Sequence, residues 1–305
     1  MDFDCETFRI DPLTDIPYNS YDIIHSHMLQ PDRYLWKQRK KIKGKTVSTV
    51  HQFISYSLRT DRNILASRIF SPFWYKYLSV ADHVVYISNS LMKDSAKHIS
   101  AKHSSCIYNG IDLAGADGII QVSDLEQINR LKQKYKLIGN FSNFTRRKGV
   151  DQLISCLAQN NGLALLLIGE GKVLSDLKAE AAKLGVEDRC FFPGFRREVK
   201  PYYKVLDAYA MTSRSEAFGL SMVEAAALRV PVVCSDIPTF RELFDDAEVS
   251  YFQPENIDSL NHAIIDSLQS ISSKISKAFQ RYQHNYTAEK MAEGYWKLYE
   301  ELLLK

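Results

Sequence analysis

Nine short apolar runs recur along the chain, and helix-like stretches with a 3.6-residue period lie between most of them. The runs do not alternate apolar with polar residues, which is typical of strands buried on both faces of a parallel sheet. We therefore predict an α/β fold with parallel sheets. The expected strands cover residues 21–27, 46–53, 83–90, 104–110, 136–141, 163–171, 189–195, 207–213 and 230–236.

Length and composition narrow the architecture. A chain of 305 residues has room for two domains, and 45% hydrophobic with 25% charged residues excludes a disordered or coiled-coil protein. We expect one domain over residues 1–110 and a second over 111–280, with 111–134 as the crossing between them. Residues 281–305 are expected to form an amphipathic helix that packs back toward the N-terminal domain, with Met291, Tyr295, Leu298 and Leu302 near one face.

Charge and cysteine usage exclude several classes of partner. The net charge of +3 does not by itself indicate nucleic acid, and we expect none. The five cysteines are scattered without a CxxC pair, so we predict neither a disulfide framework nor a zinc site. We also expect no other metal and no cofactor. The N-terminal segment lacks the apolar run of a signal peptide, and the longest apolar run, near 163–169, is too short to cross a bilayer. These features favour a cytoplasmic protein.

Residues 212–236 carry the most informative pattern: a strand, a turn, a helix, a turn and a further strand. Glu216 ends the first turn, Gly219 lets the backbone approach a ligand closely, and the helix begins near Leu220. The first N–H groups of such a helix form a seat for a diphosphate. Glu224, one turn on, can chelate the two hydroxyls of a ribose. The spacing alone fits equally well a carboxylate at a helix start and a solvated one further along, with no ligand.

This segment is similar to the signature of retaining glycosyltransferases of family 4, which have the GT-B fold. Further segments follow in the order of that family: YDIIHSH, VSTVHQF, VYISNSLMKDS, IYNGID, RRKGVDQLI, LLIGEGKVLSDLKAEAAKLGVEDRCFFPGF and SDIPTFREL. The similarity spans roughly residues 21 to 305 and implies two Rossmann-like domains that face each other across a cleft. It also implies sugar transfer from a nucleotide-sugar donor with retained anomeric configuration, usually without a metal.

The resemblance assigns roles to residues of the C-terminal domain, which in this family binds the donor. It implies that Glu224 binds the ribose and that Glu216 contacts hydroxyls of the donor sugar. The amides of Gly219 and Leu220 would hold the diphosphate. Lys148 matches the lysine that neutralises the departing diphosphate, a role for which preorganised charge is well suited.

One position departs from the family. Members usually pair this lysine with an arginine directly after the glycine of the preceding strand, but Asn140 follows Gly139 here. Arg146 or Arg147 is then the candidate for the second positive charge. In the N-terminal domain, which takes the acceptor in this family, His51 matches a histidine that reaches the donor sugar.

The N-terminal domain is expected to be shortened. Family members usually begin with a strand, a glycine-rich turn and a helix ahead of the counterpart of YDIIHSH, and about twenty residues without a Gly–Gly turn stand there in this chain. A strand missing from the sheet leaves unpaired N–H and C=O groups beside it unless the edge is covered. A late start codon, a fragment and a natural short form are alternative explanations, and activity is expected to be reduced if nothing lies upstream.

The expected function is transfer of a sugar to a glycan or lipid-linked acceptor in polysaccharide or lipopolysaccharide biosynthesis. A UDP-sugar is the preferred donor and GDP-mannose the next. The main alternative is an inactive remnant that binds a nucleotide sugar without turning it over, and an epimerase of the same fold is a further rival. A dinucleotide-binding fingerprint is not favoured, because Leu174 stands where the third glycine after Gly169-Glu170-Gly171 belongs.

Two surface features remain open. The basic run over 36–45 is either a solvated helix end or, with the aromatic residues that follow, a contact for an anionic membrane surface, so that the protein would be peripheral to the inner face. The aromatic residues are Phe70, Phe73, Trp74, Tyr75 and Tyr77. His25 and His27 lie at a strand end, and we expect their side chains to point apart, which argues against a metal site between them.

Overall fold

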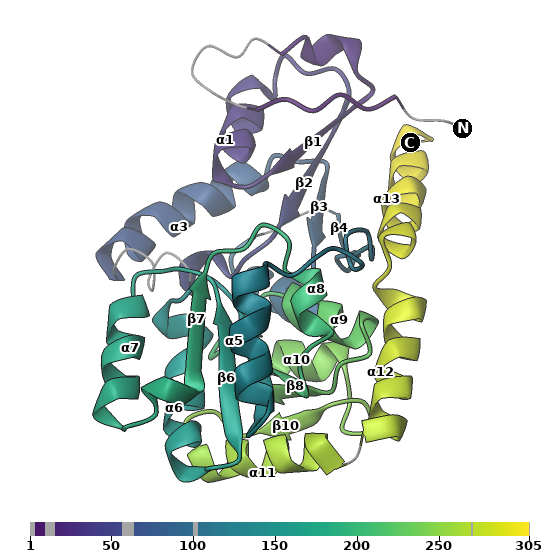
Figure 1. Cartoon of the computed structure of the whole chain (residues 1–305). Helices are drawn as coiled ribbons and strands as arrows, with labels where there is room; N and C mark the ends of the chain where they lie inside the picture. Colours follow the sequence, from purple (N-terminus) through teal and green to yellow (C-terminus); the bar gives the residue numbers. More distant parts are fainter. Residues whose placement is uncertain (1–3, 10–15, 57–63, 100–102, 270, 305) are drawn as a thin grey trace. The chain divides into compact units, whose positions relative to one another are not determined.

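The computed structural model describes residues 4–9, 16–56, 64–99, 103–269 and 271–304 (Figure 1). The chain divides into two compact units. Unit 1 comprises Met1–Tyr108 with Ala292–Lys305, and unit 2 comprises Asn109–Met291.

Unit 1 is built on a parallel sheet in the order β1-β2-β3-β4. The strands are β1 (Ile23–His27), β2 (Lys45–Val50), β3 (His83–Tyr86) and β4 (Ser104–Cys106). Ile23 pairs with Lys45, and Val47 pairs with His83. The helices of this unit are α1 (Leu29–Gln38), α3 (Ile64–Leu78), α4 (Asn89–Ser95) and the C-terminal part of α13 (Ala288–Leu303), and a short 3-10 turn, η1 (Tyr18–Ser20), precedes β1.

The two faces of this sheet pack differently. On one face Val47 and Val85 form an apolar cluster with Leu298 and Leu302 of α13. On the other face the buried carboxylate of Asp32 accepts hydrogen bonds from Ser26 (2.7 Å), Ser48 (2.6 Å) and the indole N–H of Trp74 (2.7 Å). These bonds satisfy a buried charge and tie α1 to β1, β2 and α3.

Unit 2 contains a parallel sheet in the order β10-β9-β8-β5-β6-β7. This is the doubly wound arrangement in which the chain starts in the middle, runs to one edge, and then returns to build the other half. The strands are β5 (Lys136–Phe141), β6 (Leu163–Ile168), β7 (Cys190–Gly194), β8 (Ala208–Met211), β9 (Val232–Ser235) and β10 (Ser250–Phe252).

Helices cover both faces of the second sheet (Figure 1). One face packs α6 (Val150–Gln159), α7 (Leu174–Lys183) and α11 (Ile257–Gln269) onto Ile138, Leu165 and Leu167. The remaining helical segments are α5 (Val122–Lys132), η2 (Arg146–Lys148), η3 (Glu187–Arg189), α8 (Lys200–Tyr203), α9 (Leu220–Ala227), α10 (Pro238–Leu243) and α12 (Ile271–Asn285).

The expected α/β class with parallel sheets is confirmed, and the N-terminal sheet is the smaller one, with four strands against six among the described residues. Within this part of the chain, no helix is long and apolar enough to traverse a bilayer.

Candidate functional site

The candidate site lies where the strand order of unit 2 reverses. β5 and β8 are neighbours, but β5 leads to β6 on one side and β8 leads to β9 on the other. In sheets of this kind the connections leave in opposite directions at this point, and ligands bind in the crevice beyond the carboxyl ends of the two strands. The predicted donor-site residues all follow or end these strands, in the segments 140–148 and 216–224.

Hydrogen bonds hold the two segments against each other. The amide of Arg214 donates to the Arg147 carbonyl (2.8 Å), and the side chain of Gln152 donates to the Thr212 carbonyl (3.0 Å). Gly149 ends η2 with φ +64°, and a Cβ there would lie 2.1 Å from the Thr212 carbonyl oxygen. Only glycine fits this close approach, which explains the glycine of the RRKG motif.

Glu216 is the centre of a charged cluster. Its carboxylate is buried and is contacted by Lys148 Nζ at Oε1, by Arg147 Nη1 at Oε2 (3.2 Å) and by the hydroxyl of Ser213 (3.1 Å). Burial alone would raise the pKa of Glu216, but the charges of Lys148 and Arg147 outweigh it and hold this pKa below its ordinary value. The cluster therefore carries one negative and two positive charges, a surplus suited to an anionic ligand.

The start of α9 provides backbone donors at the same place. Gly219 has φ +116°, a conformation that other residues rarely adopt, and a Cβ there would lie 2.9 Å from the ring of Phe240. The helix begins at Leu220, directly after this glycine. An α-helix leaves its first N–H groups without intrahelical acceptors, and its dipole favours an anion there.

Glu224 lies one turn into α9 and is half-buried. The hydroxyl of Tyr203 contacts both the Glu224 carboxylate (2.9 Å) and the Ser221 carbonyl (3.0 Å). Burial raises the pKa of Glu224 above its ordinary value, although the hydrogen bond from Tyr203 and the charge of Lys200 oppose the shift. Tyr203 fixes the carboxylate from one side, and nothing in the sequence pattern had pointed to this residue.

Two residues predicted to bind the donor, Arg146 and Asn140, do not contact Glu216 as Lys148 does. Arg146 is exposed, whereas Arg147 reaches Glu216 and the Ser215 carbonyl (3.0 Å). Of the two arginines, Arg147 therefore stands beside Lys148. Asn140 is buried, donates to the Ala210 carbonyl (2.7 Å) and accepts from the Ser142 hydroxyl (2.8 Å), so its amide links β5 to β8.

The segment that follows β5 is anchored in the core. Phe144 is fully buried, and its amide donates to the Glu170 carbonyl (2.7 Å). The hydroxyl of the next residue, Thr145, is buried and has no hydrogen-bond partner among the described residues. Thr145 and Ser213 are polar groups of this site that sequence reasoning missed, because hydroxyl residues are common in turns and carry no distinctive spacing.

His51 belongs to unit 1 and lies in a histidine cluster just after β2. Its Nε2 lies 2.8 Å from Nδ1 of His27, and the rings of His25 and His27 are 4.3 Å apart. The expectation that His25 and His27 point apart is wrong, because residues two apart on a strand share a face. His25 also forms hydrogen bonds with the hydroxyls of Tyr299 (2.6 Å) and Thr49 (2.7 Å), and these bonds hold its ring in place.

The low pKa values in the histidine cluster predict that the stability of the fold depends on pH. Burial and the neighbouring imidazoles lower the pKa of His25 to about 3, and burial together with His27 lowers the pKa of His51 to about 4. In the unfolded chain both imidazoles have the ordinary histidine pKa of 6.5, so the unfolded chain holds more protons than the folded one between about pH 6.5 and pH 4. We expect the free energy of unfolding to fall as the pH drops through this interval.

An NMR titration of the imidazole nitrogens checks the cause. His27→Phe leaves burial, the larger cause, in place but removes the repulsion from the second imidazole, so it should raise the pKa of His51 part of the way from about 4 toward its ordinary value. His103→Phe, which removes an imidazole elsewhere in unit 1, should leave the titration of His51 unchanged. Ordinary titration of His51 in the unaltered protein would contradict the packing described above.

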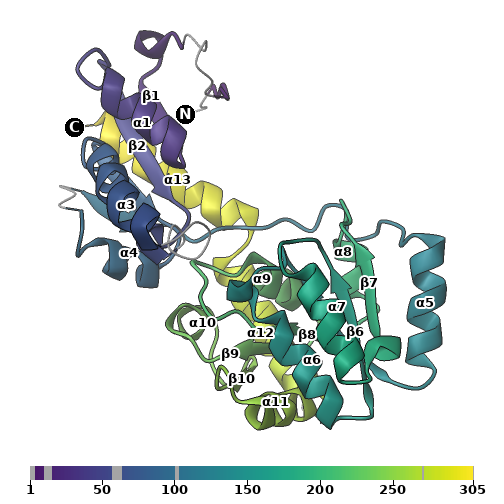
Figure 2. The ribbon, with the colours of Figure 1, turned by 90° about the vertical axis from the view of Figure 1, so that its left-hand side faces the viewer.

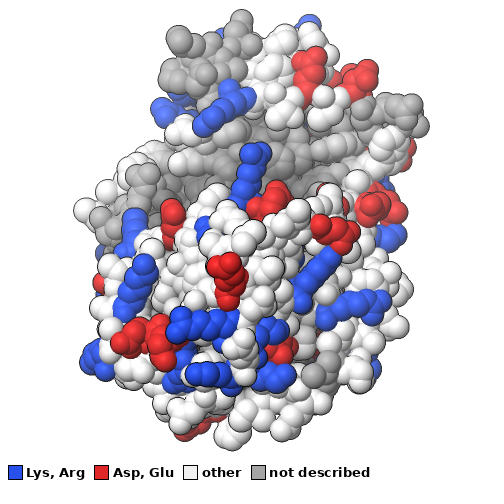
Figure 3. Space-filling model, in the orientation of Figure 1, with Lys and Arg blue, Asp and Glu red and all other residues white. Residues whose placement is uncertain are grey.

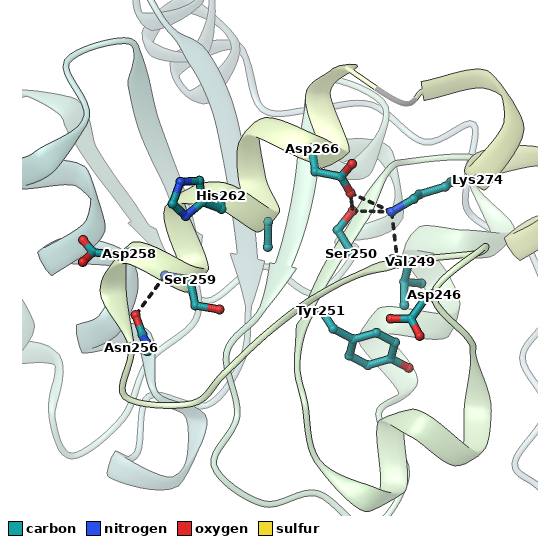
Figure 4. Close-up of a pocket in the computed structure, with 11 residues that line it drawn as sticks. Asp246, Val249, Ser250, Tyr251, Asn256, Asp258, Ser259, His262, Asp266 and Lys274 are labelled. Carbon is teal, nitrogen blue, oxygen red and sulfur yellow. Dashed lines mark hydrogen bonds and ion pairs between the residues drawn. The ribbon is translucent and has the colours of Figure 1, made fainter.

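A separate cavity of about 560 Å³ lies along α11 and β10 (Figure 4). Polar side chains that line it are paired with each other: Lys274 Nζ donates hydrogen bonds to the Asp266 carboxylate (2.6 Å) and to the Ser250 hydroxyl (3.1 Å). It contains none of the predicted site residues, and its strand, β10, is at the far edge of the sheet from β7 and two strands away from β8. Among the described residues, no group of three or more His, Cys, Asp or Glu side chains is placed so that it could hold a metal ion, the histidine cluster included.

Comparison with known families agrees with this two-sheet α/β architecture. Residues 122–285 match the model of glycosyl transferases group 1, and residues 14–114 match that of glycosyltransferase family 4. The chain belongs to the glycosyl transferases group 1 family, and the GT-B fold expected from the sequence is confirmed.

Individual relatives include glycosyltransferases named for O-antigen and lipopolysaccharide core biosynthesis. The O-antigen biosynthesis glycosyltransferase WclY of Escherichia coli is 29% identical over 294 residues, which cover 92% of this chain and 80% of WclY. The lipopolysaccharide core biosynthesis mannosyltransferase LpsB of Rhizobium meliloti (strain 1021) is 26% identical over 215 residues, covering 66% of this chain and 61% of LpsB. The crystal structure of Anabaena Alr3699/HepE with UDP and glucose has a TM-score of 0.75 at 21% identity, covering 92% of this chain and 78% of that one.

Proposed function

We propose that this protein transfers a sugar from a nucleotide-sugar donor to a glycan or lipid-linked acceptor, with retention of the anomeric configuration. The observation that carries the proposal is the cluster of Lys148, Arg147 and Glu216 beside the start of α9. Two cations and a helix N-terminus suit a diphosphate, and a carboxylate suits sugar hydroxyls. The relatives named for O-antigen and lipopolysaccharide core biosynthesis support an acceptor of that class.

The proposed donor is a UDP-sugar, and GDP-mannose is the second candidate. What supports UDP is that the HepE structure contains it, and what supports GDP-mannose is the mannosyltransferase name of LpsB. Glu224 binds the two ribose hydroxyls, and the Tyr203 hydroxyl holds its carboxylate in place. When the donor binds, its diphosphate forms ion pairs with Lys148 and Arg147 in place of Glu216. The Glu216 carboxylate is then free to accept hydrogen bonds from the donor sugar.

The proposed chemistry needs no metal. The bond between the anomeric carbon and the diphosphate oxygen breaks, which leaves positive charge on the sugar and negative charge on the diphosphate. Lys148, Arg147 and the first amides of α9 stabilise that negative charge. Electrostatic stabilisation by groups that are already in position is usually the largest contribution to catalysis. The acceptor oxygen bonds to the anomeric carbon on the face that the diphosphate leaves, and its proton passes to the departing phosphate. His51 contacts the donor sugar, as the family resemblance implies.

Mass spectrometry after incubation with a panel of UDP-sugars and GDP-mannose tests the function. We expect slow release of the nucleoside diphosphate from one donor, and faster release when the acceptor is added. Tight binding of UDP with no turnover for any donor or acceptor would favour the inactive remnant instead.

The ion pair of Glu216 gives a more specific prediction. Glu216→Gln removes the carboxylate charge that faces Lys148 and Arg147, so UDP alone should bind about fivefold more tightly, corresponding to about 1 kcal/mol. Transfer should become about tenfold slower, because an amide accepts weaker hydrogen bonds from the sugar. Calorimetry for UDP and a turnover assay measure the two effects separately.

Glu255→Gln provides a matched control, since Glu255 pairs with Arg214 at the neighbouring segment and is more exposed. It should change neither UDP binding nor turnover. Weaker UDP binding in Glu216→Gln would mean that this carboxylate does not compete with the diphosphate.

A further inference from the structure

The solvent-facing side of α3 carries large apolar side chains, and its exposed polar residues Arg68 and Lys76 are both basic. Leu65, Ile69 and Phe73 follow one another at four-residue spacing and are 66%, 46% and 53% exposed, and Phe70 beside them is 47% exposed. The opposite side of the same helix buries Trp74 and Leu78 together with Ser67 and Ser71. A surface helix normally turns polar residues outward, so large apolar side chains on its exposed side are unusual. A group of large exposed apolar side chains indicates a contact surface.

The neighbouring helix α1 presents a basic stripe. Arg33 and Lys37 are four residues apart, which places them on one side of α1, and Lys40 lies in the turn that follows the helix; all three are exposed. Asp32 carries the single carboxylate in α1 and α3, and it is buried. Among the described residues of these helices and of 39–45, the ion pairs are limited to Arg39 with Asp82.

The two stripes form one fixed surface, which we call the α1/α3 surface. α1 and α3 pack against each other in unit 1 (Figure 2). The rings of Trp36 and Tyr77 are 5.2 Å apart, and Lys76 Nζ lies 5.4 Å from the centre of the Trp36 ring. The bond from Trp74 to Asp32 locks the helices together underneath. Of the aromatic cluster noted in the sequence, Trp74 and Tyr75 are buried, whereas Phe70 and Phe73 face outward.

We propose that the α1/α3 surface docks on a lipid bilayer that contains anionic head groups. The exposed apolar residues of α3 insert at the boundary between head groups and acyl chains, and Arg33, Lys37 and Lys40 contact the negative charges above it. The charge distribution selects this occupant. A second copy of the same surface would bring like charges together, whereas an anionic bilayer complements them. Over unit 2, by contrast, basic and acidic side chains are mixed on the face shown in Figure 3.

The docking is independent of sugar transfer, although it suits a lipid-linked acceptor if the proposed function holds. Co-flotation of the full chain with phosphatidylcholine vesicles, with and without phosphatidylglycerol, tests it. We expect flotation with the anionic vesicles, and loss of flotation at high salt. Lys37→Glu/Lys40→Glu should lower the partition coefficient at least about tenfold, since each basic residue near the surface contributes about 1 kcal/mol. Ile69→Ser/Phe73→Ser should also abolish flotation.

Two controls test whether flotation depends on this particular surface and not on overall charge or on catalytic activity. Lys134→Glu/Lys277→Glu makes the same charge change at exposed positions of unit 2 and should float as the unaltered protein does. Lys148→Ala should float equally well, whatever its activity. Unaltered protein that stays in the aqueous fraction would overturn the proposal, as would equal flotation of Lys37→Glu/Lys40→Glu. A dimer in sedimentation analysis that Ile69→Ser/Phe73→Ser dissociates would assign the surface to a second copy instead.

Discussion

Lys148→Ala is expected to lower the turnover number about 10²- to 10³-fold while the donor KM changes little, because the ammonium acts mainly on charge that develops as the diphosphate departs. Lys148 is half-buried beside Arg147, on the turn that Gly149 closes, so its backbone is held in place before the donor binds. Steady-state kinetics with the donor found by mass spectrometry provide the measurement. A large rise in KM at unchanged turnover would instead make Lys148 a ground-state binding residue.

The same substitution leaves the buried carboxylate of Glu216 with one cation fewer, and that could itself disturb the site. The double variant Lys148→Ala/Glu216→Gln removes the charge on both sides and separates the two effects. It should stay as inactive as Lys148→Ala. Recovery of turnover in the double variant would show that the loss came from the orphaned carboxylate. Lys204→Ala, at an exposed ion pair with Asp117, should keep normal activity.

Glu224→Ala is expected to raise the donor KM and the dissociation constant of UDP about 10- to 100-fold, with a smaller change in turnover. Hydrogen bonds to a charged group contribute about 1.5–3 kcal/mol, and the ribose does not take part in bond breaking. Tyr203→Phe should shift binding in the same direction by a smaller factor, because it removes the hydrogen bond that positions the carboxylate. Calorimetric titration with UDP measures both variants.

A ligand that lacks the ribose hydroxyls gives the matched comparison. The unaltered protein should bind 2′,3′-dideoxy-UDP about as weakly as Glu224→Ala binds UDP, and Glu224→Ala should not distinguish the two ligands. Glu180→Ala on α7 should distinguish them as the unaltered protein does. An equal preference for UDP in Glu224→Ala and in the unaltered protein would remove Glu224 from the ribose.

The sequence was sufficient to predict most of the fold, since each of the nine expected strands has an observed counterpart. Apolar runs that are buried on both faces are the clearest signal a parallel sheet gives. β10 was missed because it has three residues, Ser250–Phe252, and too few positions to show a pattern. α5 was missed because it lies in the charged segment that we interpreted as a crossing between domains, and its buried side is limited to Asp124, Ile128 and Leu131.

The candidate site was predictable as a motif but not as a set of contacts. Spacing and resemblance identified Lys148 and Glu216, and the fold brings these two side chains together. Arg146 and Arg147 are adjacent in sequence, so only the backbone of η2 decides which one faces Glu216. Tyr203 contacts Glu224 from a short helix before β8, and such a long-range partner leaves no trace in the local pattern.

A crystal structure of the protein with UDP tests the central claim most directly. We predict that the β-phosphate lies within hydrogen-bonding distance of Lys148 Nζ and of the amides at the start of α9, while both ribose hydroxyls contact the Glu224 carboxylate. UDP bound elsewhere in unit 2, for example in the cavity along α11 and β10, with Lys148 still paired to Glu216, would contradict it.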